Sequence, residues 1–196
     1  MKALRDKRSF RSLSLLVAAA LAVGLSGCGR PVHPNGVSQG ELSDGAEPYF
    51  WTGAVTYQVQ ISRQLNPYDT YDVQYLSGLK DAQHLAPQQF WFGVFLWAKN
   101  QSGHPARTAD RFEIVDSAGN VYRPTPLPNT NPYAWTQQTL SPNGIEPMAA
   151  GAAASSPTGG ALVLFKLNQS VYSNRPLTLK IFAPGSRRAS NVSLDL

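Results

Sequence analysis

The chain has 196 residues, 15% of them charged, and a formal net charge of +5. Five of its 17 basic and one of its 12 acidic residues precede the single cysteine, Cys28, so residues 28–196 carry 12 basic and 11 acidic side chains. This near balance, without a clustered basic face, argues against a nucleic-acid partner. The 169 residues from Cys28 onward are too few for two domains with separate cores.

The first 27 residues show the parts of a secretory signal in the expected order. Basic residues come first, an almost wholly apolar stretch runs from Leu13 to Leu25, and small residues precede Cys28. The apolar stretch is shorter than the roughly 20 residues that a membrane-spanning helix needs. The tetrapeptide Leu25-Ser26-Gly27-Cys28 resembles the lipobox of bacterial prolipoproteins.

This resemblance implies a covalent lipid anchor. The Cys28 thiol would be alkylated with diacylglycerol and the preceding peptide bond cut, so that Cys28 becomes the first residue of the mature chain. We therefore expect a lipoprotein signal peptide over 1–27 and a lipidated cysteine with a flexible tether over 28–48, where no hydrophobic period is visible. The expected location is the extracytoplasmic face of the cell membrane, with the diacylglycerol as anchor and no other cofactor.

From residue 49 onward the pattern is typical of short β-strands. Val55, Tyr57, Val59 and Ile61 alternate with polar residues, which predicts a half-buried strand. Residues 89–100, QFWFGVFLWAKN, are the most hydrophobic segment after the signal and predict a second strand.

The later part of the chain predicts a hairpin, a long loop and three more strands. The hairpin covers 111–124 around a Gly119-Asn120 turn. In 124–160, proline and glycine argue against a helix despite several alanines. The three closing strands are expected at 161–167, 177–183 and 192–196.

Together these elements predict an all-β fold. About seven short strands separated by turns favour one immunoglobulin-like antiparallel β-sandwich over residues 49–196. Since Cys28 is the only cysteine, the disulfide of antibody domains is absent, and the core alone must hold the domain together.

Short motifs in this order resemble a known family. The motifs are a strand ending in Lys99-Asn100, a hairpin with Asp116, Gly119 and Tyr122, a late strand with Phe165, and a final Leu177, Leu179 and Ile181. They are similar to the secreted immunoglobulin-like domain of unknown function found in many Gram-positive lipoproteins and related to a mycobacterial immunoprotective extracellular antigen. The chain departs from that pattern at Leu167, where the family often has proline. The resemblance implies a sandwich fold and an extracytoplasmic location, and it brings no catalytic residues.

The first candidate binding group lies in the connection after the first strand. Tyr68, Asp69, Tyr71 and Asp72 combine aromatic rings, which stack on sugars, with carboxylates, which accept hydroxyl hydrogen bonds. Calcium would need about six oxygen ligands, more than two carboxylates supply. The alternative is that the tyrosines pack on the edge of the sandwich.

The second candidate is one face of the 89–100 strand. If Trp91, Phe95 and Trp97 formed an exposed aromatic strip, it would contact a protein, a glycan or a lipid. The alternative is a buried strip covered by residues 64–88 or 124–160, and burial is the commoner fate of large aromatic side chains.

The sequence suggests no enzyme. Its histidines, His33, His84 and His104, lie far apart without metal-ligand spacing, and the usual nucleophile and phosphate-binding motifs are absent. We expect a non-enzymatic binding or interaction module of the cell envelope, without metal, that meets the membrane through its lipid and an envelope protein or glycan through its domain. The alternative is a structural or accessory subunit of an envelope transport or wall-assembly complex, and a hydrolase comes third.

Overall fold

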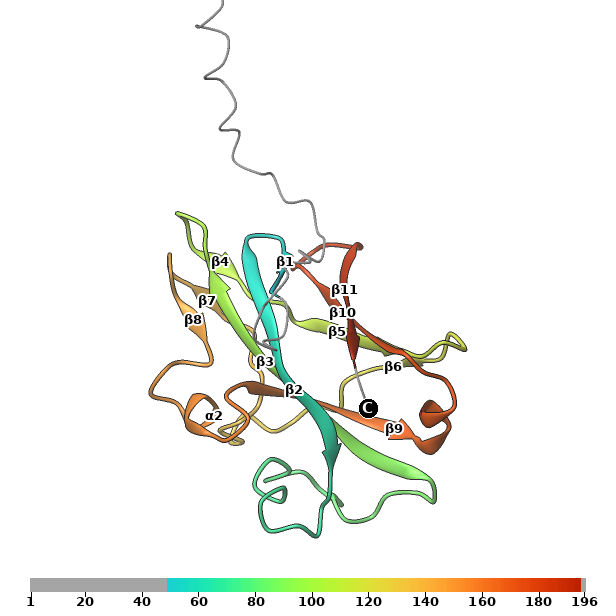
Figure 1. The fold of residues 1–196 in the computed structure, drawn as a ribbon. Helices are drawn as coiled ribbons and strands as arrows, with labels where there is room; N and C mark the ends of the chain where they lie inside the picture. The colour runs from blue at the N-terminus through green and yellow to red at the C-terminus, as the bar shows by residue number, and fades with distance from the viewer. Residues whose placement is uncertain (1–48, 195–196) are drawn as a thin grey trace, which may run out of the picture. The chain divides into compact units, whose positions relative to one another are not determined.

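The computed structural model describes residues 49–194, which are almost entirely β-strands and loops (Figure 1). The expected signal peptide, the lipidated Cys28 and the tether lie outside the described residues. The elements are β1 (Phe50–Thr52), β2 (Val55–Leu65), β3 (Gln89–Asn100), β4 (Ala106–Arg107), β5 (Arg111–Val115), β6 (Val121–Tyr122), β7 (Thr139–Leu140), β8 (Ile145–Glu146), α2 (Ala152–Ser155), β9 (Ala161–Asn168), the 3-10 turn η1 (Gln169–Tyr172), β10 (Leu177–Phe182) and β11 (Ala189–Leu194).

Two antiparallel sheets form the sandwich. One has the order β1-β2-β3-β8, with β9 also paired to β3, and the other has the order β11-β10-β5-β6. Strands β4 and β7 form a separate two-stranded ladder. In immunoglobulin sandwiches strands A, B and E share one sheet and C, F and G the other. Here β2, β3 and β9 take the A, B and E places, and β5, β10 and β11 take C, F and G, so the predicted fold class is confirmed.

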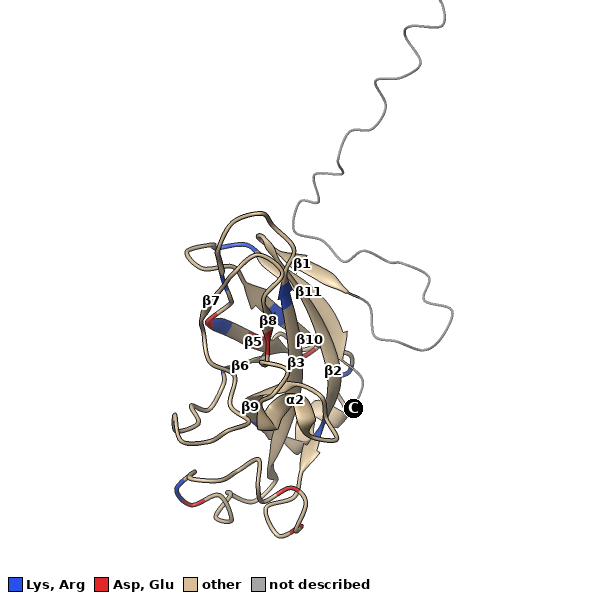
Figure 2. Cartoon of the chain, turned by 90° about the vertical axis from the view of Figure 1, so that its left-hand side faces the viewer, with Lys and Arg blue, Asp and Glu red and all other residues tan. Residues whose placement is uncertain are grey.

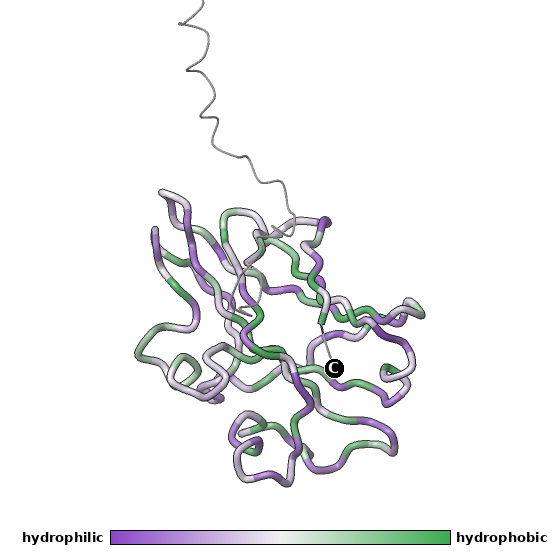
Figure 3. Tube along the Cα trace, in the orientation of Figure 1, coloured by the Kyte–Doolittle hydropathy of each residue, from purple (hydrophilic) through white to green (hydrophobic). Residues whose placement is uncertain are grey.

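The main core lies between the two sheets. On β3, Phe90, Phe92, Val94 and Leu96 are buried in the same cluster as Ile114, Leu179, Ile181 and Val192 of the opposite sheet. Figure 3 shows hydrophobic stretches along the central strands and more hydrophilic loops. Figure 2 shows that charged residues are few and scattered over several elements. Burial of this apolar surface is the main force that holds the two sheets together.

Strand β2 contains a bulge that reverses the side to which its residues point. Val59 lies opposite Leu96 and Ile61 lies opposite Phe95, so the ladder shifts by one residue at Gln60. An extra residue shifts the alternation of side chains by one. Ile61 is therefore 39% exposed, and the period-two prediction is wrong for Ile61 although it is right for Val59.

Two smaller predictions also need correction. The alanine stretch forms one helical turn, α2, where proline and glycine had argued against any helix. Strand β11 begins at Ala189, earlier than the predicted Val192, because the whole segment from Ala189 to Leu194 pairs with β10. Within residues 49–194, no helix is long and apolar enough to cross a membrane.

Candidate functional site

The aromatic face of β3 is not an open surface. Trp91 and Phe95 are 2% and 0% exposed, whereas Trp97 is half-buried with its ring edge-on to that of Tyr49. The expectation of an exposed strip is therefore wrong for Trp91 and Phe95. The alternative, burial beneath the connection after β2, describes both residues.

The cover over this face is the segment 66–88. Its Tyr75 and Leu76 are buried in a second cluster with Trp91 and Phe95. The rings of Tyr75 and Phe95 meet edge-on with centroids 5.0 Å apart, and the Trp91 Nε1–H donates to the Ala82 carbonyl at 2.7 Å. Strand β3 is apolar on both faces because each face has its own cover.

The tyrosine and acid group of the same segment splits into two roles. Asp72 is buried and pairs with the Arg63 guanidinium, and it also accepts the Asn66 N–H at 2.9 Å. Burial alone would raise the pKa of Asp72, but the hydrogen bonds from Arg63 and Asn66 and the Arg63 charge outweigh it and hold that pKa below its usual value. Asp72 therefore anchors the segment.

The other three members remain near the surface. Asp69 accepts the backbone N–H groups of Tyr71 at 2.8 Å and Asp72 at 3.3 Å, so it stabilises the turn. Tyr68 and Tyr71 are 72% and 77% exposed. The Tyr68 hydroxyl donates to the Gln83 carbonyl at 3.0 Å. The structure thus leaves two tyrosines available for contact and gives the two acids structural partners.

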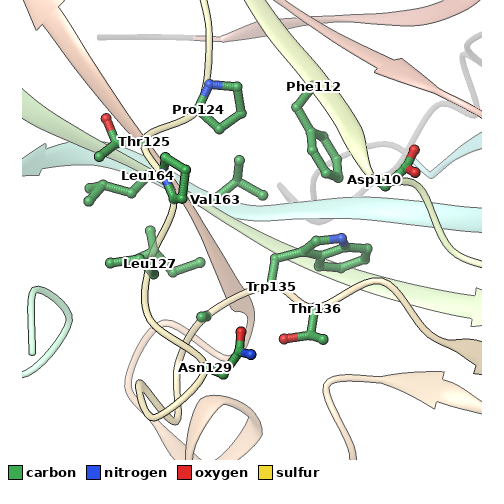
Figure 4. A pocket seen from close by; sticks show the side chains of 13 residues that line it. Asp110, Phe112, Pro124, Thr125, Leu127, Asn129, Trp135, Thr136, Val163 and Leu164 are labelled. Carbon is green, nitrogen blue, oxygen red and sulfur yellow. The ribbon is translucent and has the colours of Figure 1, made fainter. Parts of the chain in front are cut away.

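A groove beside Trp135, which the sequence did not indicate, is a candidate for ligand binding (Figure 4). Its volume is about 140 Å³. It is lined by Asp110, Phe112, Pro124, Thr125, Pro126, Leu127, Asn129, Ala134, Trp135, Thr136, Leu162, Val163 and Leu164. We call it the Trp135 groove.

Strand β9 positions the two walls of the groove. The Thr125 N–H donates to the Leu164 carbonyl at 2.7 Å. Two residues earlier on the same edge, the Leu162 carbonyl accepts from the Trp135 N–H at 2.8 Å, and the Leu162 N–H donates to the Tyr133 carbonyl at 2.6 Å. The proline-rich segment 124–129 and the segment 133–136 are therefore held on one edge of β9, and the groove lies between them.

The Trp135 side chain is held rigidly by the sandwich. Its Nε1–H donates to the Ala109 carbonyl at 2.8 Å. Its ring centroid lies 5.9 Å from that of Tyr57 and 5.7 Å from that of Phe112. Burial raises the pKa of the Tyr57 phenol, so Tyr57 stays neutral and accepts the Ala109 N–H at 2.7 Å. The indole is half-buried and forms a fixed wall rather than an adaptable one.

Polar side chains border this apolar groove. Asp110, Asn129 and Thr136 are exposed, and Thr125 is half-buried. They supply a carboxylate, an amide and two hydroxyl groups around aromatic and proline walls, which is a set suited to reversible binding. Among residues 49–194, no group of three or more His, Cys, Asp or Glu side chains is placed to hold a metal ion. His84 and His104 are both exposed and lie outside the groove.

The comparisons with known proteins found similarity to solved structures alone. No protein-family model matches it, and no curated protein does. Among solved structures, it is similar to the yjhA protein from Bacillus subtilis, with 10% identity over 76% of this chain and 98% of that chain and a TM-score of 0.44. An uncharacterized β-sandwich protein from Clostridium difficile covers 76% of this chain and 91% of its own, with 10% identity and a TM-score of 0.41.

A third solved structure is similar to the same degree. It is a conserved hypothetical protein from Bacillus anthracis, with 9% identity over 74% of this chain and 93% of that chain and a TM-score of 0.42.

Proposed function

We propose that the protein is a lipid-anchored binding module on the extracytoplasmic face of the cell membrane, and that it contacts an envelope glycan through the Trp135 groove. The observation that carries this proposal is the groove itself, in which a rigid indole is combined with an acid, an amide and two hydroxyl groups. Aromatic side chains contact the apolar faces of sugar rings, and carboxylates and amides bind their hydroxyl groups.

The size of the groove favours a part of a long ligand over a whole small molecule. Pockets that enclose a small molecule have volumes of about 300–1,000 Å³, whereas this one has about 140 Å³. A glycan chain that places one sugar unit in the groove and continues along the surface needs only a small volume of this kind. Among residues 49–194, no acid or histidine other than Asp110 lines the groove, which supports binding without hydrolysis.

The proposed location rests on the sequence. The lipobox-like Leu25-Ser26-Gly27-Cys28 follows a signal-like segment, and the family resembled by residues 99–181 occurs in secreted lipoproteins. We propose that the chain is a distant relative of that family. A diacylglycerol on Cys28 would supply the membrane anchor, strengthened where a second acyl chain is added.

A second candidate function is that of an accessory subunit of an envelope complex. The exposed Tyr68 and Tyr71 favour it, because aromatic side chains are enriched in protein interfaces. If this role is correct, replacing both by alanine lowers the yield of a co-purified envelope protein and leaves glycan binding unchanged.

Glycan binding is tested with the full chain in detergent and a soluble oligosaccharide of β-linked N-acetylglucosamine. Asp110→Asn should weaken binding about tenfold in calorimetry, since a hydrogen bond to a charged group contributes about 1.5–3 kcal/mol. The matched control is Asp81→Asn, which removes an exposed carboxylate from segment 66–88, outside the groove. If both variants weaken binding equally, or if the unmodified chain does not bind the oligosaccharide, glycan binding in the Trp135 groove is contradicted.

The anchor is tested separately in cells. Cys28→Ser should move the protein from the membrane fraction to the soluble fraction, and the mass of the wild-type chain should show an added diacylglycerol. A wild-type chain that carries no lipid and is still attached to the membrane would contradict the proposed lipid anchor.

A further inference from the structure

Glu146 is a buried acid without a partner. In the ladder it lies opposite Ala98 of β3, whose neighbour in β2 is Tyr57. The residue is only 6% exposed, and its Oε2 atom has no hydrogen-bond partner. Neither of the ion pairs found between residues 49 and 194 includes it. Since burying an unpaired carboxylate is strongly unfavourable, this position calls for an explanation.

Glu146 lines a hollow of about 230 Å³. The rest of the lining is uncharged, with polar groups from Thr136 and Gln138 and apolar surface from Pro132, Pro147, Met148 and Ala153. Met148 is 68% exposed, so a flexible side chain stands where the hollow meets solvent.

We propose that this hollow binds a small primary amine, held as its ammonium ion by Glu146 and along its carbon chain by Pro147 and Met148. The ammonium ion would supply the opposite charge that the Glu146 carboxylate lacks. Its remaining N–H groups would find the side-chain oxygens of Thr136 and Gln138 in the same lining.

Other ligand classes fit the lining less well. A divalent metal ion needs about six oxygen ligands, and the hollow offers a single carboxylate. A neutral hydroxyl group would satisfy the Glu146 oxygen but leave its charge unpaired among apolar walls. The volume is also below the roughly 300 Å³ at which enclosing pockets begin, which limits the occupant to a short chain.

The occupancy of the hollow is expected to depend on pH. Burial raises the pKa of the Glu146 carboxyl to about 7, while an alkylammonium ion keeps its proton up to about pH 10. Since only the ionised carboxylate forms the pair, the apparent affinity should fall about tenfold from pH 8 to pH 6.

Other titratable groups near Glu146 do not line its hollow. Among residues 49–194, no other acid or base contributes to that lining. The Tyr57 phenol, on the same face of the sheet, has its pKa raised by burial. Lys99 follows Ala98 in β3 and so points to the opposite face. Arg107, in the nearby β4–β7 ladder, is exposed and donates to Gln137, and Asp110 lines the Trp135 groove.

The test uses the full chain in detergent with carbon-13 in the methionine methyl groups. Of the two methionines in the sequence, Met1 and Met148, only Met148 follows Cys28, and Met148→Leu identifies the signal at the hollow. Titration with n-propylammonium chloride should shift the Met148 signal saturably at about pH 8, with about tenfold weaker affinity at pH 6. n-Propanol, the uncharged analogue, should leave the signal unchanged.

Two variants complete the experiment. Glu146→Gln keeps the shape and removes the charge, so the propylammonium-induced shift should disappear. Asp110 lines the Trp135 groove and not this hollow, although Ala134 and Thr136 line both. Asp110→Asn should therefore leave amine binding unchanged, and loss of glycan binding alone would not contradict the amine proposal. An equal response to propanol, retained amine binding in Glu146→Gln, or no saturable shift up to about 0.1 M amine would overturn the proposal.

Discussion

Glu146 and Asp72 are two buried acids with opposite surroundings. Glu146 has an oxygen without a partner and a pKa raised to about 7, whereas Asp72 has the Arg63 guanidinium and a lowered pKa. The folded protein thus holds the Glu146 proton more tightly than the unfolded chain, and the Asp72 proton less tightly. These differences make opposite contributions to how stability changes with pH.

For Glu146, stability should fall as the pH rises. The folded pKa of about 7 exceeds the unfolded value of 4.5, so the stability present below pH 4.5 is lost progressively up to pH 7. Glu146→Gln should therefore be more stable than the wild type by up to about 3 kcal/mol at pH 8, with little difference in acid. Urea unfolding at a series of pH values measures this. An unchanged difference between the two proteins across that range would contradict it.

For Asp72, the sign is reversed. Its folded pKa is below the unfolded one, so its contribution is complete at neutral pH and is lost as the pH falls through the folded pKa. Asp72→Asn should lower the unfolding free energy by about 1–3 kcal/mol at pH 7 and by much less in acid. Asp81→Asn, at a carboxyl group that is largely exposed, is the control and should have little effect. Equal losses in the two variants would show that the Arg63 pair does not anchor segment 66–88.

At the scale of elements, strand β3 depends on a close approach at Gly93. A Cβ atom there would lie 3.0 Å from Leu162 Cδ1, 3.0 Å from Phe95 Cε2 and 3.1 Å from Leu65 Cδ1. The glycine makes room for side chains of three neighbouring positions and marks no bulge, since the register around it is regular.

Gly93→Ala should therefore destabilise the protein by about 1–3 kcal/mol, the usual cost of overpacking. The control is Gly103→Ala in an exposed loop, where a Cβ atom meets nothing within 4 Å, and its effect should be near zero. Thermal unfolding of both variants measures the difference. If Gly93→Ala is as stable as Gly103→Ala, the packing on the outer face of β3 is looser than described.

An element could be predicted where its own sequence pattern determines it, and not where pairing with another strand determines it. Strand β3 has the predicted bounds 89–100, because a continuous apolar run ending in a turn needs no further information. Ile61 was misplaced because a bulge depends on the register with β3, which the sequence of β2 alone does not reveal. The early start of β11 likewise depends on pairing with β10.

In the whole molecule, neither of the two proposed binding sites could be predicted from local sequence. The Trp135 groove unites the start of β5, the segments 124–129 and 134–136, and β9, and these meet only after the sheets have formed. Asp110 and Asn129 resemble ordinary loop residues in the sequence. Glu146 is likewise ordinary in its local sequence and becomes buried because β8 pairs with β3.

The tryptophan side chains allow glycan binding in the Trp135 groove to be tested directly. Of the four tryptophans, Trp135 alone lines the groove, Trp91 is buried beneath segment 66–88, and Trp97 packs on Tyr49. Each indole therefore reports on a different place in the molecule.

The measurement is fluorine NMR of the full chain with fluorotryptophan, titrated with the β-linked N-acetylglucosamine oligosaccharide. Trp→Phe variants assign the four signals. Glycan binding in the groove should cause a saturable shift of the Trp135 signal while the Trp91 and Trp97 signals stay in place. A shift of the Trp97 signal without one of Trp135, or no shift at all, would contradict glycan binding in the Trp135 groove.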